Sequence, residues 1–255
     1  MNPITIPKTM EKELKEIYKN LLGVYGYQGW WPLFNEETGK IEYHPGKYSL
    51  PENDSQRFEI CLGAILAQNT SWKNVEKALG NLRKNNLLNK EEIKLIETKK
   101  LAGLIKSSGY NNQKAKKIKE FIIFLDSKKE INRENLLGVW GIGKETADSI
   151  LLYAYSKPIF VIDSYTKRIF SRLGFCEENI NYNKLQDLFH ENLGKDTKLF
   201  NEYHALIVEH AKRFCRKKPL CRRCSLNNIC NFYKTNESCI VALSGLKLSK
   251  KIIVC

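Results

Sequence analysis

The sequence predicts an all-α protein built from two helical lobes. Apolar residues recur at three- and four-residue spacing along most of the 255 residues, which is the period of a helix with one buried face. Short polar connections separate these segments, and the two-residue alternation typical of strands is nearly absent. A chain of this length can bury one large core or two smaller ones, so two lobes of helices are expected.

The predicted helices follow one another with little interruption. The first covers residues 8–22, where the apolar side chains at helical spacing are Met10, Leu14, Ile17, Tyr18, Leu21 and Leu22. Residues 25–56 are rich in Gly, Pro, Tyr and Trp and predict an irregular but ordered loop. Further helices are predicted over residues 58–67, 71–83, 90–97, 98–105, 112–125, 133–137 and 146–154. Nothing repeats at a fixed period, which argues against a solenoid.

Composition and charge limit the classes of function. The formal net charge of +14 favours a polyanionic partner such as nucleic acid, with a compositional habit of lysine richness as the alternative. No run of about eighteen apolar residues is present, and the N-terminal residues lack the core of a signal peptide. We therefore expect a cytoplasmic, nucleoid-associated protein without a membrane partner. Its eight cysteines are then expected to be metal ligands or free thiols rather than disulfides.

A glycine hairpin is the most informative motif. The stretch Val-Trp-Gly-Ile-Gly-Lys-Glu-Thr-Ala, which begins at Val139, predicts a tight turn whose second arm opens a helix. Glycines permit positive φ and let a flat partner approach the backbone closely. Amides at the start of the following helix then face an anion such as a DNA phosphate. The expected DNA contacts in this motif are Gly141, Gly143, Lys144 and Thr146.

Four cysteines near the C-terminus predict a metal centre. Cys215, Cys221, Cys224 and Cys230 lie within sixteen residues. Zinc and a 4Fe-4S cluster are both compatible with four thiolates. Only one short Cys-x-x-Cys pair is present, and the unequal loops favour the cluster over zinc. Basic residues crowd this segment, which indicates either a phosphate-binding loop or charge compensation for an anionic cluster.

Together these features resemble one superfamily of DNA repair enzymes. The hairpin, the apolar helix after it and an acid, Asp163, near the start of the next helix resemble the helix-hairpin-helix base-excision DNA glycosylases. Many of these proteins end in a cluster loop, Cys-x6-Cys-x2-Cys-x5-Cys, which the cysteine segment resembles with one residue fewer in its first gap. The resemblance covers roughly residues 25–230. It implies a 4Fe-4S cluster, a cleft between two helical lobes and double-stranded DNA with a damaged base as the partner.

The resemblance also implies a division of the chain. We expect a central helical-barrel domain over residues 57–157 that carries the hairpin. Residues 1–56 and 158–235 are expected to form a second helical domain with the cluster loop. Residues 236–255 contain no motif that indicates a role. A monomer is expected.

Two acidic residues carry the expected chemistry. A glycosylase breaks the C1′–N bond through an oxocarbenium-like state, which a nearby carboxylate stabilises. The resemblance gives this role to Asp163, and the alternative is that Asp163 only caps its helix. Bifunctional relatives carry a nucleophilic lysine where this chain has Glu145, which cannot form a Schiff base. Lys144 is adjacent but points about 100° away on a helix, so a monofunctional, water-using enzyme is expected, with Glu145 and Lys144 as secondary candidates.

The base pocket is expected to be aromatic. Trp30, Trp31, Pro32 and Phe58 resemble the elements with which the bacterial 3-methyladenine glycosylase III group stacks on an extruded alkylpurine. Such bases are cationic, and a desolvated cation over an aromatic face gains roughly 1–2 kcal/mol. The alternative is that the two tryptophans are core anchors. Gln68 resembles the residue that fills the gap left by the base, or else it is a buried capping amide.

The sequence singles out three further residues. Lys114 begins a predicted helix, where it either meets a phosphate or is simply solvated. His204 and His210 lie on the helix before the cysteines, and structural roles are expected for both.

The sequence therefore predicts a base-excision DNA glycosylase that removes an alkylated purine by hydrolysis. The first alternative is a bifunctional, endonuclease III-like glycosylase and lyase acting on oxidised pyrimidines. The second is a non-catalytic DNA-binding protein.

Overall fold

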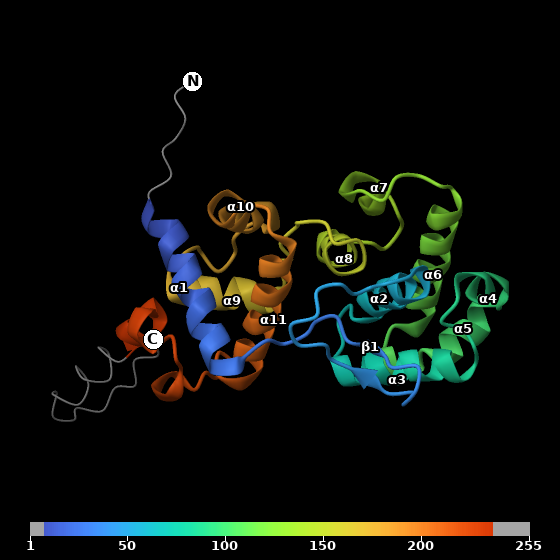
Figure 1. The fold of residues 1–255 in the computed structure, drawn as a ribbon, viewed down its shortest axis with the longest axis horizontal. Helices are drawn as coiled ribbons and strands as arrows, with labels where there is room; N and C mark the ends of the chain where they lie inside the picture. Colours follow the sequence, from blue (N-terminus) through green and yellow to red (C-terminus); the bar gives the residue numbers. More distant parts are fainter. Residues whose placement is uncertain (1–7, 237–255) are drawn as a thin grey trace, which may run out of the picture.

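Two groups of helices make up residues 8–236, which are the residues that the computed structural model describes. One group contains α2 to α8, and the other contains α1 with α9, α10 and α11 (Figure 1). The labelled α-helices are α1 (Lys8–Tyr25), α2 (Asp54–Leu66), α3 (Trp72–Lys84), α4 (Lys90–Leu95), α5 (Thr98–Leu104), α6 (Asn111–Asp126), α7 (Arg133–Leu137), α8 (Lys144–Ser149), α9 (Ser164–Leu173), α10 (Tyr182–Leu193) and α11 (Thr197–Arg213). Residues 231–236 are helical as well. The predicted all-α class is confirmed. No helix of these residues is long and apolar enough to cross a membrane.

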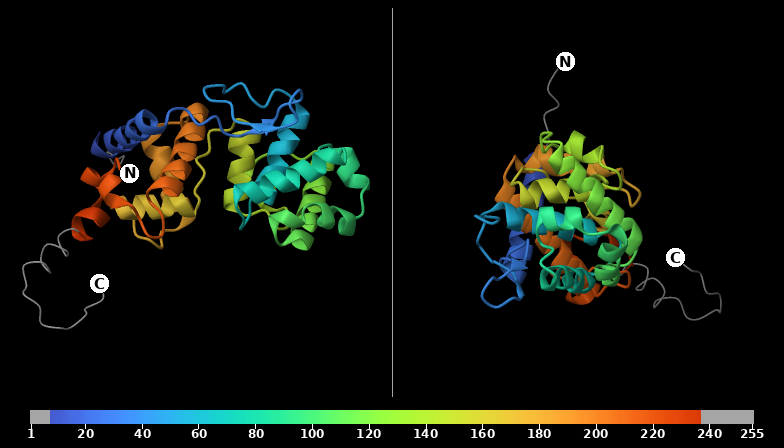
Figure 2. Two further views of the ribbon diagram at one scale, coloured as in Figure 1. Left: turned by 90° about the horizontal axis from the view of Figure 1, so that it is seen from below. Right: turned by 90° about the vertical axis from the view of Figure 1, so that its right-hand side faces the viewer.

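The chain crosses between the groups twice. The segment after α1 passes from the group of α1 to the group of α2 to α8, and the segment before α9 returns to the group of α1 (Figures 1 and 2). The first crossing contains a small antiparallel ribbon of β1 (Leu33–Phe34) and β2 (Ile41–Glu42), in which Leu33 pairs with Glu42. This ribbon lies inside the predicted irregular loop. Both crossings run beside the junction of the two groups, so they can deliver side chains to it.

Helix α2 is the centre of its group. Asn53 caps it by accepting a hydrogen bond from the Gln56 N–H at 2.9 Å, and an Asn cap of this kind fixes where a helix begins. For this reason α2 begins four residues before the predicted position of 58. Every residue from Phe58 to Leu66 is buried, as expected for a helix that is surrounded by others.

The helix after the hairpin changes its winding. Helix α8 continues into a π-helical turn, η2 (Ile150–Ala154), whose five residues are all buried. This turn packs against α2 in one group and against α11 in the other. Single π-turns inside helices are frequent at functional sites, because the extra residue redirects side chains. Here the turn carries Tyr153 to the junction of the groups.

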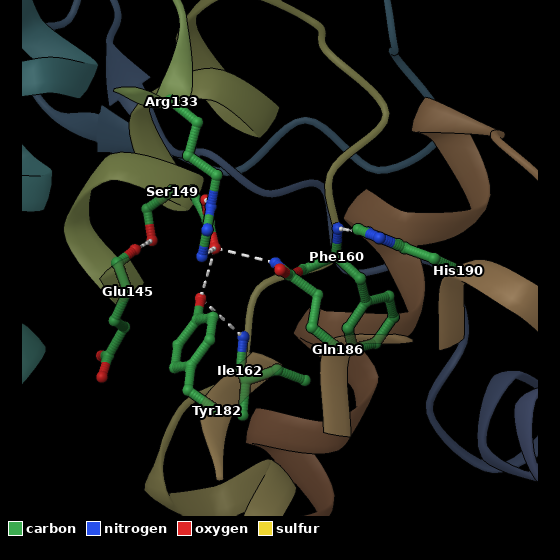
Figure 3. A network of polar contacts seen from close by, with 9 residues as sticks. Arg133, Glu145, Ser149, Phe160, Ile162, Tyr182, Gln186 and His190 are labelled. Atoms are coloured by element: carbon green, nitrogen blue, oxygen red, sulfur yellow. Dashed lines mark hydrogen bonds and ion pairs between the residues drawn. The ribbon is translucent and has the colours of Figure 1, made fainter. Parts of the chain in front are cut away.

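A buried carboxylate ties the hairpin to the second group. Asp148 of α8 has no exposed side-chain surface, and its two oxygens accept from Arg133 Nε and Nη2 at 2.7 and 3.1 Å. The Tyr182 hydroxyl and the Gln186 amide of α10 also donate to Asp148, each at 2.7 Å. Gln186 donates further to the Phe160 carbonyl, on the segment that leads to α9 (Figure 3). This network joins α7, α8 and α10 next to the return crossing.

Replacing Asp148 with Ala is expected to lower the free energy of unfolding by about 2–4 kcal/mol, because three donors lose their acceptor. Arg133 keeps about a quarter of its side chain exposed (28%), and water there reduces the loss below that of a fully buried pair. Chemical denaturation measures the change. Asp148→Asn is the matched control, since it retains one acceptor oxygen and should lose less. Equal stability of the Ala variant and the parent would contradict this role.

Candidate active site at the junction of the helical groups

An open cleft of about 840 Å³ lies where the two groups meet, within the range of roughly 300–1,000 Å³ usual for small-molecule sites. Both groups and both crossings contribute to its wall. Nine of the residues predicted for the site line it: Trp30, Trp31, Gln68, Gly141, Gly143, Lys144, Glu145, Thr146 and Asp163. Two predicted members of the base pocket, Pro32 and Phe58, are buried and do not line the cleft.

Asp163 is both a helix cap and a cleft residue. Its Oδ1 accepts from the Thr166 N–H at 2.7 Å and from the Thr166 hydroxyl at 2.8 Å, which fixes the start of α9. Its Oδ2 lies 3.8 Å from Nε2 of His204, and its side chain is 12% exposed. Capping and a role in the cleft are therefore compatible, since each uses a different oxygen.

Glu145 is the second acid in the cleft wall. It is the second residue of α8 and points away from Arg133 (Figure 3). Its side chain is reached by solvent, yet the surrounding protein desolvates the carboxyl and, together with the charge on Asp163, raises its pKa to about 7. Lys167 opposes this shift.

Four aromatic rings form one wall of the cleft region. Trp30 and Trp31 meet edge to face with ring centroids 5.6 Å apart. Trp72, at the start of α3, lies 5.8 Å from Trp30 and 5.2 Å from Trp31. Tyr153 lies 5.1 Å from Trp31. Trp31 is 8% exposed and belongs to the core as well as to the cleft. The core-anchor alternative and the expected place in the cleft therefore each describe part of the environment of Trp31.

Several residues in or next to the cleft were not predicted as site residues. Trp72 and Lys212 line the cleft and received no role, and a structural role was expected for His204. Tyr153, which is buried against Trp31 and does not line the cleft, also received no role. The Lys212 ammonium lies 5.6 Å from the centroid of the Trp30 ring. The sequence gives only a slight indication of these positions. Trp72 follows Gln68 by four residues, and Lys212 follows His204 by eight residues on the same helix.

The hairpin uses its two glycines differently. Gly141 has φ +83°, and a Cβ there would lie 2.5 Å from the side chain of Lys117, so only glycine fits. Gly143 is extended with φ −90° and precedes α8 without a side-chain cap. Positive φ is therefore needed at only one of the two positions. Gly143 is exposed and, with the first residues of α8, lines the cleft, so the N-terminus of this helix borders the cleft.

Gln68 is bound to this hairpin. Its amide nitrogen donates to the Gly141 carbonyl at 3.1 Å and to the Thr146 hydroxyl at 2.9 Å, and its oxygen accepts from Lys117. The geometry is that of a half-buried bridging amide. Insertion of Gln68 into DNA stays a prediction, and it requires the release of these hydrogen bonds.

Lys114 contacts no solvent, which corrects both expectations for it. The side chain is 1% exposed, and its ammonium donates to the carbonyls of Leu66 and Ser108 at 2.8 and 2.6 Å. Burial, with the neighbouring charge of Lys117, lowers its pKa to about 8. The ammonium therefore donates to the last carbonyl of α2 and is not available to a phosphate.

The four predicted ligand cysteines gather in one place. They line a single small cavity together with His210 and Arg172. Arg172 Nη1 lies 3.4 Å from Cys215 Sγ, and His210 Nε2 lies 3.4 Å from Cys224 Sγ. Within the described part of the chain, none of the four thiols forms a disulfide. Among residues 8–236, however, no three His, Cys, Asp or Glu side chains are already arranged to hold one metal ion.

Comparison with known proteins identifies the family. The HhH-GPD superfamily of base excision DNA repair proteins matches residues 62–195. A putative DNA repair glycosylase of Methanocaldococcus jannaschii is 44% identical over 228 residues, which cover 84% of this chain and 94% of that protein. Endonuclease III of Sulfolobus acidocaldarius is 31% identical, with 70% and 83% of the two chains covered.

Two solved structures share the fold. The H. pylori 3-methyladenine DNA glycosylase bound to 1,N6-ethenoadenine is 29% identical and superposes with a TM-score of 0.62 over 81% of this chain and 97% of that chain. An endonuclease III–DNA complex has a TM-score of 0.73 at 16% identity, over 89% and 98% of the two chains. The chain therefore belongs to the HhH-GPD superfamily of base-excision repair proteins and is a DNA glycosylase, a hydrolase of N-glycosidic bonds.

Proposed function

We propose that this glycosylase removes alkylated purines from double-stranded DNA by a monofunctional hydrolysis. The observation that carries the proposal is the aromatic wall of Trp30, Trp31, Trp72 and Tyr153, which stands in the same cleft region as Asp163. A cationic alkylpurine gains from stacking on such rings more than a neutral base does. The likeness to an H. pylori enzyme that was solved with an adenine adduct supports this substrate class.

The chemistry requires only a carboxylate and water. The damaged base is first extruded from the duplex into the cleft. The electron pair of the C1′–N bond then leaves with the base, which neutralises the positive charge of the alkylpurine. The Asp163 carboxylate stabilises the positive charge that develops on the sugar and accepts a proton from the water that attacks C1′. Glu145 provides no amine for a covalent intermediate.

End-labelled duplexes test the proposal. Each duplex carries one lesion: an alkylated purine, an oxidised pyrimidine, uracil, or adenine opposite oxidised guanine. Half of every reaction then receives hot alkali. Strand breaks that need alkali and are most abundant with the alkylpurine are expected. Breaks without alkali on the oxidised pyrimidine would instead establish the bifunctional alternative, in which Lys144, also in the cleft wall, supplies the amine.

The DNA duplex is proposed to lie across the mouth of the cleft. The open amides at the start of α8 and the residues Gly141, Gly143, Lys144 and Thr146 can meet the phosphate backbone. The net charge of +14 supports a polyanionic partner. A monomer acting on the nucleoid is part of the same proposal.

We also infer that Cys215, Cys221, Cys224 and Cys230 bind a 4Fe-4S cluster, with zinc as the less favoured alternative. The support is their convergence on one cavity and the softness of four thiolates, which suits iron–sulfur chemistry. Arg172, which faces Cys215 Sγ, can balance the negative charge of such a centre. The cluster would brace the loop after α11, and no step of the hydrolysis passes through it.

The purified protein is expected to contain iron and sulfide and to absorb broadly in the visible range. The Cys224→Ser variant should lose most of that absorption, because the cluster loses one of its four ligands. It should also unfold at a lower denaturant concentration, because the loop after α11 is no longer braced. Metal analysis and denaturation curves measure both effects. Cys176→Ser is the control, since this half-buried cysteine lies outside the cavity. One zinc per chain without iron would contradict the cluster.

A further inference from the structure

His204 lies between the catalytic candidate and the aromatic wall. Its side chain is buried, at 8% exposure, in the wall of the cleft. Nδ1 lies 2.7 Å from the hydroxyl of Tyr153, whereas Nε2 has no hydrogen-bond partner among residues 8–236 and lies 3.8 Å from Oδ2 of Asp163. A buried polar atom without a partner costs free energy, so this nitrogen calls for an explanation.

The two neighbours of His204 favour one position of its ring proton. Burial raises the pKa of Tyr153 well above its usual range and lowers the pKa of His204. Asp163 raises the histidine pKa and Lys212 lowers it, and these are the charged groups that act on the ring. A neutral tyrosine hydroxyl can donate to Nδ1 or accept from it, so the Tyr153 contact is compatible with either tautomer. A proton at Nε2 faces the Asp163 carboxylate, whereas the other tautomer turns a nitrogen lone pair toward that carboxylate, so we place the ring N–H at Nε2.

We propose that His204, held by Tyr153, is a positioning residue that fixes the free oxygen of Asp163 in the cleft. Oδ1 of Asp163 is already held by Thr166, which leaves Oδ2 as the oxygen that can serve the sugar and the water. The Nε2–H of His204 completes the orientation of this carboxylate when the gap of 3.8 Å closes by a small movement. The inference rests on the proposed function, because it takes Asp163 as the catalytic carboxylate.

The same pair links the base pocket to the carboxylate. The ring of Tyr153 packs against Trp31 at 5.1 Å and against Trp30 at 6.5 Å. Its hydroxyl holds His204, and His204 faces Asp163. The tryptophans that are proposed to stack on the base are therefore in ring contact with Tyr153, the residue that holds His204. Neutrality of the imidazole also matters, because a charged ring would neutralise the carboxylate that the reaction needs.

Single-turnover excision of an alkylpurine from a duplex tests the inference. His204→Leu is expected to slow excision about 10- to 100-fold, as a misplaced catalytic group does, while the affinity for the duplex stays unchanged. His204→Gln, whose amide can place an N–H near the position of Nε2, should recover much of the loss. His190→Gln is the matched control: this histidine accepts from the Phe160 N–H at 2.9 Å on the same crossing segment but does not line the cleft.

Two readouts separate positioning from a merely structural role. In an Asp163→Asn background, His204→Leu should cause no further loss of rate, because the group that it positions is already disabled. Recovery of the rate in His204→Gln is the second readout, because a variant that only disturbs packing gains nothing from a restored N–H. An unchanged rate, or the same fold-loss with and without Asp163, would overturn the inference. An Asp163→Asn enzyme that remains active would instead overturn the proposed function.

Discussion

Replacing Asp163 with Asn is expected to slow base excision about a hundredfold to ten-thousandfold while DNA binding survives. The amide keeps the shape of the carboxylate but holds no charge for the oxocarbenium-like sugar and accepts no proton from water. Asn is also a good helix cap, so Oδ1 can still accept from Thr166 as Asp163 does at 2.7 Å. Single-turnover excision and binding to a lesion-containing duplex measure the two effects.

The choice of Asn makes this test specific. Asp163→Ala would remove the cap of α9 as well, at a cost of about 1 kcal/mol in stability, and a slower enzyme could then reflect a disturbed helix. Comparison of unfolding curves for the Asn and Ala variants separates the cap from the chemistry. If the Asn variant excised bases at the parent rate, capping alone would account for Asp163.

Local motifs allowed the central part of the fold and site to be predicted. The glycine spacing determines the turn and the start of α8, because both depend on residues that are adjacent in sequence. The cap at Asp163 is equally local. Even so, the pattern did not show that only Gly141 needs positive φ, since the backbone of Gly143 is set by the helix that it precedes.

Residues that reach the cleft from distant elements could not be predicted in this way. His204 and Trp72 line the cleft from α11 and α3, and Tyr153 of η2 packs against Trp31. Helical periodicity marks a side as buried without showing that it borders a cleft. The π-helical turn at η2 shifts the register that periodicity assumes. Lys114 shows the converse error: a lysine at a helix start looks solvated, yet two carbonyls from other segments bind it.

Some predictions remain open for physical reasons. The roles of the site residues depend on contacts with DNA, which the contacts within the chain do not determine. Residues 237–255, with Cys239 and Cys255, lie outside the described part of the chain, so the tail keeps no assigned role. Phe58 was expected to stack on the base, but α2 turns it into the core.

Replacing Glu145 with Lys is expected to convert a glycosylase that leaves the sugar–phosphate chain intact into one that cuts it. The position lies in the cleft wall beside Asp163, where the wild-type carboxyl has a pKa of about 7 through desolvation and the charge on Asp163. The same desolvation favours the neutral form of an introduced amine, which is the nucleophilic form. That amine can attack C1′, form a Schiff base and lead to elimination of the 3′ phosphate.

Borohydride trapping measures the change, because reduction of the Schiff base leaves a covalent protein–DNA complex. The variant should give trapped complex and strand breaks without alkali, and the parent should give neither. Lys144→Ala is the control, at an enzyme concentration that saturates the duplex and so compensates for the phosphate contact proposed for Lys144. If Lys144 takes no part in the chemistry, this variant gives neither trapped complex nor strand breaks without alkali. Trapped complex with the parent that disappears in Lys144→Ala would show that Lys144 already acts as a nucleophile. Failure of the Glu145→Lys variant to form any complex, with excision retained, would show that position 145 does not face the sugar, and Glu145 would then lose its place in the mechanism.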